Sequence, residues 1–120
     1  MIMTRFVVVN GKDYPVKEIT GRMSDSEWEG RETKTITMET TYTDIKKLFK
    51  DNTSWAIKCH YEPDEKEKEE GKEPFDEVFD NSDFLMSGKI VDTRDGFMSI
   101  TMGKLSEMES LISDIYGSVN

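Results

Sequence analysis

The sequence predicts a small α+β domain built on one mainly antiparallel sheet of five to six strands, either open or curled into a partial barrel, with two covering helices. Two hairpin turns, Asn10-Gly11 and Asp95-Gly96, separate alternating apolar and polar runs. Strands joined by such short turns pair antiparallel. Two other stretches, about 41–50 and 105–116, space their apolar residues at helical intervals. With 120 residues, the chain forms a single domain over 1–120.

The first predicted element is a hairpin of strands 4–9 and 12–19. Asn and Gly both tolerate the positive φ of a type I′ turn, whose twist suits a hairpin. The residues that follow, 20–34, are polar, and we expect them to form a projecting second hairpin. It returns through 35–40, where Ile36 and Met38 alternate with threonines in the pattern of a half-buried strand.

The first helix is predicted over 41–50. Thr41 is a candidate N-cap, Asp44 lies three residues later, and Ile45, Leu48 and Phe49 share one helical face. A further strand is predicted over 54–61, with Trp55, Ile57, Cys59 and Tyr61 on one face.

The acidic segment 62–74 holds hardly any apolar residue that could repay the entropy of ordering, so we expect a mobile loop. A hairpin of strands 84–92 and 97–102 follows. The second helix, over 105–116, begins at a capping box of Ser106 and Glu109 and ends before Gly117. Its apolar stripe comprises Met108, Leu111, Ile112, Ile115 and Tyr116.

Charge and composition limit the partners. Sixteen Lys and Arg residues against 25 Asp and Glu leave a net charge of −9. Such a surface repels phosphates and anionic lipids, so neither nucleic acid nor a membrane is an expected partner. The single Cys59 has no intramolecular disulfide partner, and the first residues lack the apolar length of a secretion signal. We therefore expect synthesis in a reducing cytoplasm.

The residues that could carry chemistry do not form a catalytic set. Cys59 and His60 are neighbours on a predicted strand and point to opposite faces, so they cannot act together. The acids Asp76, Glu77, Asp80 and Asp83 lack the spacing of a calcium loop. We expect neither an enzyme nor a bound metal or cofactor.

Trp28 is the most suggestive functional residue because only polar residues flank it closely. Either it folds back onto the sheet, or it anchors a protein partner from the tip of the projecting hairpin. We assign Met23, Glu27, Trp28 and Arg31 to a candidate partner-binding site.

Three segments carry a family resemblance: NGKDYPVKEITGR, WEGRETKTITMETTYTDIKKLF and SGKIVDTRDGFMSITMGKLSEMESLISDIYG. They resemble small proteins encoded in phages and prophages of Gram-positive bacteria, of the virion-structure and tail-assembly class. The resemblance implies a structural or assembly protein, made in the bacterial cytoplasm and carried in the virion or needed only for assembly. Its partners would be copies of itself or other virion components. The alternative is a stand-alone adaptor or inhibitor whose acidic segment imitates nucleic acid.

Overall fold

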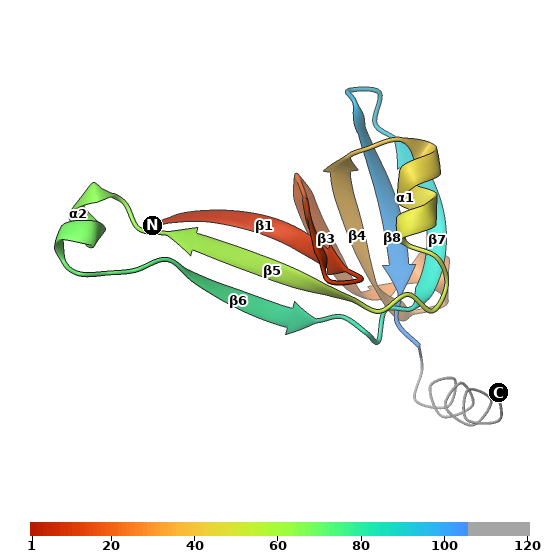
Figure 1. The fold of residues 1–120 in the computed structure, drawn as a ribbon. Coiled ribbons are helices and arrows are strands. Elements are labelled where there is room, and N and C mark those ends of the chain that lie inside the picture. Colours follow the sequence, from red (N-terminus) through yellow and green to blue (C-terminus); the bar gives the residue numbers. More distant parts are fainter. Residues whose placement is uncertain (106–120) are drawn as a thin grey trace.

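The computed structural model describes residues 1–105, which form two open, four-stranded antiparallel sheets (Figure 1). Sheet A has the order β2-β1-β5-β6, and sheet B has the order β3-β4-β8-β7. The strands of sheet A are β1 (Ile2–Val9), β2 (Lys12–Pro15), β5 (Trp55–Glu62) and β6 (Phe75–Asp80). Those of sheet B are β3 (Glu18–Asp25), β4 (Arg31–Glu39), β7 (Met86–Asp92) and β8 (Phe97–Gly103). The α+β class is confirmed, but eight strands in two sheets replace the predicted single sheet or partial barrel.

The first hairpin forms as predicted, and its second strand then changes sheet. Asn10 and Gly11 have φ values of 54° and 75°, as a type I′ turn requires. The backbone N–H of Val16 donates to Arg5 in sheet A (3.1 Å), and that of Lys17 donates to Thr37 in sheet B (2.8 Å). The predicted strand 12–19 is therefore two strands, β2 and β3, because consecutive residues bond to different sheets.

The polar segment 20–34 forms a hairpin, but this hairpin lies in sheet B and does not project. Its return strand β4 pairs with β3 on one side and with β8 on the other. The turn contains a 3₁₀ helix, η1 (Ser26–Trp28), which Asp25 caps by accepting from the Glu27 N–H at 3.0 Å. The same carboxylate accepts from the Thr33 hydroxyl at 2.9 Å, which ties the turn to β4.

Helix α1 (Tyr42–Leu48) confirms the helix predicted over 41–50, although it ends earlier. The Thr41 hydroxyl accepts from the Asp44 N–H at 3.2 Å, the expected N-cap contact. Ile45 and Phe49 are fully buried beneath the helix. The helix predicted over 105–116 lies outside the described residues except for Leu105.

The hydrophobic core lies under α1, where the inner face of sheet B meets the near end of sheet A. Trp55 is its largest member, and its Nε1–H donates to the Phe84 carbonyl at 2.9 Å. Phe49 meets the Trp55 ring edge-on, with centroids 5.7 Å apart. The other core residues are Val7, Val9, Ile36, Met38, Ile45, Ile100 and Met102. Each large side chain contributes about 1.5–3 kcal/mol on burial.

Beyond this core, β1, β5 and β6 continue as a three-stranded arm whose outer part stands clear of sheet B (Figure 1). We define the arm as residues 1–6 and 57–80. A short helix, α2 (Glu65–Glu69), lies at its tip inside the segment expected to be a loop. Asp64 and Glu67 form a reciprocal capping box that holds α2 together without apolar burial. It is thus the arm, and not the hairpin 20–34, that projects from the body.

Candidate protein-interaction site

The arm has two faces of different character, which the strand register defines. Cross-strand partners share a face, and three rows of partners continue outward from the core on the same side as Val9 and Trp55. The rows are Val7–Ile57–Phe79, Arg5–Cys59–Glu77 and Met3–Tyr61–Phe75. We call the apolar members outside the core, Met3, Ile57, Cys59, Tyr61, Phe75 and Phe79, the arm face.

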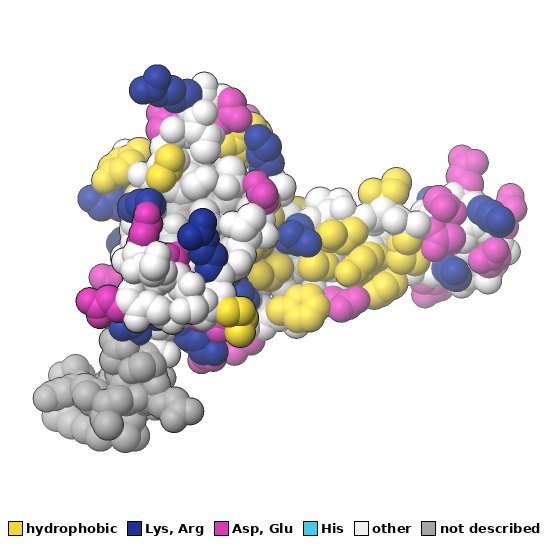
Figure 2. Space-filling view, turned by 180° about the vertical axis from the view of Figure 1, so that it is seen from behind, with side chains coloured by type: hydrophobic (Ala, Val, Ile, Leu, Met, Phe, Trp, Pro, Cys, Tyr) yellow, Lys and Arg dark blue, Asp and Glu magenta, His cyan; other side chains and the backbone are white. Residues whose placement is uncertain are grey.

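The arm face is apolar and largely uncovered in the described residues. Met3 is 42% exposed, Phe75 46% and Phe79 50%, whereas Val7 in the same layer is fully buried. Tyr61 and Phe75 stack with their centroids 4.7 Å apart. Figure 2 shows the resulting hydrophobic band along the arm, which ends at the charged tip. Exposed apolar side chains grouped in this way are typical of a surface that another protein covers.

Partial burial on this face raises the pKa of the Tyr61 phenol, and the nearby Glu77 carboxylate raises it further. Cys59 is buried between the two aromatic rows. The arm face therefore continues the core and is not a scatter of single apolar residues.

The opposite face of the arm is occupied by charged groups that satisfy one another. Lys58 lies 2.7 Å from Asp13 and 3.7 Å from Asp76. The His60 ring nitrogens lie 2.6 Å from Glu62 and 2.5 Å from Asp76. The pKa of His60 is raised by its hydrogen bond to Glu62 and, next, by its hydrogen bond to Asp76. The same bond to His60 lowers the pKa of Asp76. This face has the polar character of a solvated one, although Ile2 and Val78 also lie on it.

A cleft of about 290 Å³ lies where the arm face meets β3. Ile57, Cys59 and Phe79 line one side, and Ile19 and Gly21 line the other. Lys34 also lines it, and its ammonium donates to Oδ1 of the buried Asn81. Burial lowers the pKa of Lys34. The cleft extends the arm face towards sheet B.

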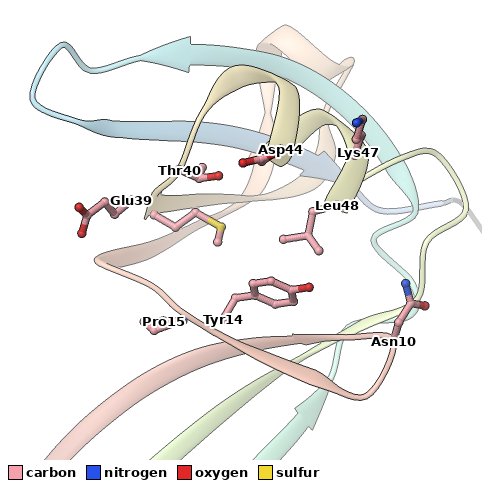
Figure 3. Close-up of a pocket in the computed structure, with 9 residues that line it drawn as sticks. Asn10, Tyr14, Pro15, Glu39, Thr40, Asp44, Lys47 and Leu48 are labelled. Carbon is pink, nitrogen blue, oxygen red and sulfur yellow. The ribbon is translucent and has the colours of Figure 1, made fainter.

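Two further hollows lie beside α1. The pocket in Figure 3, of about 490 Å³, separates α1 from the β1–β2 hairpin. Tyr14 and Leu48 point toward one another across it, and the described lining residues include neither histidine nor cysteine. The second is a larger groove of about 810 Å³ between α1 and β7. Its lining includes four lysines, Lys46, Lys47, Lys50 and Lys89, and one acid, Asp51.

The residues assigned from sequence to a partner-binding site mostly make contacts within the chain. The Trp28 ring packs over Gly88 and Gly103 on β7 and β8, at distances that leave no room for a Cβ on either glycine. Trp28 is half-buried, which matches the alternative that it folds back onto the sheet. The two glycines open a slot for the indole on sheet B, and partner binding by Trp28 stays a prediction.

Glu27 and Arg31 also make contacts within the chain. Glu27 lies 3.1 Å from Lys89, and the Arg31 guanidinium donates to the Lys104 carbonyl at 2.7 Å. Met23 is 81% exposed, and the Glu27 side chain is 65% exposed despite its ion pair. The contacts of Glu27, Trp28 and Arg31 therefore stabilise one end of sheet B.

The residues considered for chemistry are not brought together. Cys59 and His60 lie on opposite faces of β5, as predicted from their adjacency. Asp76 and Asp80 share the charged face of β6, while Glu77 lies on the arm face. Within residues 1–105, no three His, Cys, Asp or Glu side chains are grouped to hold a metal ion.

Sequence reasoning missed the arm face because its members fit the pattern of core residues. The alternation of strand 54–61 places Tyr61 on the same face as Trp55, and nothing local distinguishes its exposure from that of Trp55. One signal could have identified the arm: the acidic segment begins directly after Tyr61 and ends just before Phe75. A charged turn between two apolar runs places those runs side by side and far from the core.

Comparison of the chain with protein-family models, with curated proteins and with solved structures found no match. In the part of the chain that the structure describes, neither helix has the length and apolarity needed to cross a membrane.

Proposed function

We propose that this chain is a non-enzymatic structural subunit that assembles through its arm face, which packs against another copy of the same chain. The observation that carries the proposal is the exposure of Met3, Phe75 and Phe79 in a layer whose inner end is the core. Covering apolar area stabilises an assembly by about 25 cal/mol per Å². A rigid, three-stranded platform also loses little conformational freedom on binding.

Charge favours a second copy over an unrelated partner. The same chain carries an acidic arm tip and a lysine-lined groove at the opposite end of the molecule (Figure 1). The resemblance to phage virion-structure and tail-assembly proteins supports a phage or prophage particle as the setting. Repeated contacts between identical subunits are the usual way to build such particles.

Sedimentation velocity of the full chain over a range of concentrations tests the proposal. We expect concentration-dependent association that Phe79→Asp abolishes, because a carboxylate on the arm face would be buried without a partner. Val78→Asp is the matched control, since Val78 is the adjacent residue of β6, is 62% exposed and lies on the opposite face. A chain that stays monomeric at every concentration, or that associates equally well with Phe79→Asp, contradicts the proposal.

A stand-alone inhibitor that imitates nucleic acid is the second candidate, and the exposed acids of α2 favour it. Such a protein would be a monomer that binds a basic partner in a salt-sensitive way. The sedimentation experiment separates the two functions, because only the structural subunit associates with itself.

A further inference from the structure

We infer that the acidic tip of one arm docks into the lysine-lined groove between α1 and β7 of the next copy, so that subunits join tip to groove. This inference rests on the proposed function and specifies which surface of the neighbouring copy receives the arm.

The groove presents positive charge that the described residues leave unpaired. Lys46, Lys47 and Lys50 have no carboxylate within ion-pair distance among residues 1–105. The ammonium of Lys46 lies 5.6 Å from the centre of the Tyr42 ring. The one acid in the lining, Asp51, accepts a hydrogen bond from the Ser87 N–H at 2.7 Å. Three such lysines on one groove are notable in a chain whose net charge is −9.

The arm tip presents the opposite charge. Residues 62–73 contain seven Asp and Glu residues and three lysines, which leaves four net negative charges. Glu67 is engaged by the Met1 amino group at 2.6 Å, and Glu70 by Lys72 at 3.6 Å. Glu65 and Glu69 are exposed and have no ion pair among the described residues. Four residues apart on α2, they lie on one side of the helix.

The two surfaces cannot meet within one molecule. The tip and α1 lie at opposite ends of the structure, with the length of the arm between them (Figure 1). Eight residues of β1 or β5 span about 26 Å. The contact therefore joins different patches on two copies. It closes as a two-fold dimer where the two arms are exchanged reciprocally, and it builds a ring or a filament where they are not.

The lining of the groove complements the side chains of α2. The groove has a volume of about 810 Å³, and Tyr42 and Ile90 add apolar surface to its lysines. We expect Glu65 and Glu69 to contact the lysines of the groove, and the arm face to supply most of the apolar contact.

Complementary charge reversal tests the inference in the full-length chain. The groove variant is Lys46→Glu with Lys50→Glu, and the tip variant is Glu65→Lys with Glu69→Lys. Each alone should associate about tenfold more weakly than the wild type, equivalent to about 1.4 kcal/mol. An equimolar mixture of the two should recover association, because each tip then meets a groove of opposite charge. Lys12→Glu, compared with Lys46→Glu alone, is the control for net charge, since Lys12 is exposed on the β1–β2 hairpin.

The outcomes separate this inference from the proposed function. Loss in each variant with recovery in the mixture supports the tip-to-groove contact. If both variants associate like the wild type while Phe79→Asp still dissociates the assembly, the groove is not the docking surface and the arm-face proposal stands. If Lys12→Glu weakens association as much as Lys46→Glu, the effect is one of net charge and the inference is overturned. A wild-type chain that never associates overturns both.

Discussion

Val7 and Phe79 lie in the same cross-strand row of sheet A, joined through Ile57, yet Val7 is fully buried and half of Phe79 is exposed. The row passes from the core of the domain to its surface within three strands. A single sheet face thus serves as core at one end and as an open platform at the other. This continuity distinguishes the arm face from ordinary exposed apolar residues.

The Trp28 slot should not tolerate a side chain. We expect Gly103→Ala to destabilise the fold by about 1–3 kcal/mol, because its Cβ would overlap the indole ring. Urea unfolding measures the loss, and the fluorescence of the displaced Trp28 should shift to the red. Gly21→Ala is the control, since the nearest neighbour of its added Cβ would be the Thr33 carbonyl oxygen at 3.7 Å, an ordinary contact distance. Equal stability of both variants would show that the ring does not occupy the slot.

Asn81 should be a stability determinant at the root of the arm. It is buried, accepts from the Lys34 ammonium and donates to the Phe79 carbonyl at 2.9 Å. Asn81→Ala leaves both partners unsatisfied, so we expect a loss of about 1–3 kcal/mol in the free energy of unfolding. Thermal unfolding of the variant checks this. An unchanged melting temperature would mean that water replaces the amide fully.

The pairing of β5 with β6 should depend on pH through His60. Glu62 and Asp76 raise the pKa of His60 above 6.5. The charged bridge that His60 forms with these two carboxylates is therefore complete below pH about 6.5 and is lost as pH rises through the raised pKa. The pKa of Asp76 is lowered below 3.8, so its part is lost only as pH falls through that lowered value. The bridge is therefore fully formed between pH about 4 and 6.5.

Hydrogen-exchange protection factors of the β6 amides measure this dependence. We expect them to fall between pH 6 and pH 8 in the wild type, once corrected for intrinsic exchange. His60→Gln, which cannot gain a charge, should flatten the profile. A wild-type profile as flat as that of the variant would show that the bridge does not hold the edge strand.

Local signals in the sequence predicted much of the fold. Asn10-Gly11 and the Thr41 cap depend on a few adjacent residues, and both predictions are confirmed. The division into β2 and β3 was not predicted, although the apolar positions shift from Tyr14 and Val16 to Ile19 where the hydrogen-bond partners change sheet. Strand β6 was not predicted, because its apolar residues Phe75, Val78 and Phe79 do not alternate with polar ones.

The candidate site was less predictable than the fold. Trp28 finds its slot against Gly88 and Gly103, which are 60 and 75 positions away, and no local pattern reports such a contact. The segment around α2 buries little and so predicts a loop, but a capping box satisfies its backbone without burial. The arm face is exposed because the strands of sheet A extend beyond sheet B.

Thiol protection on adjacent residues of β1 tests the central claim most directly. Met3→Cys places a thiol on the arm face and Ile2→Cys places one on the opposite face, while the native Cys59 is buried. Each variant is treated with a maleimide at rising protein concentration. We predict that the thiol at position 3 reacts progressively more slowly as the protein associates, whereas that at position 2 reacts at a constant rate. Concentration-independent reaction at both positions would contradict the assembly of this chain through its arm face.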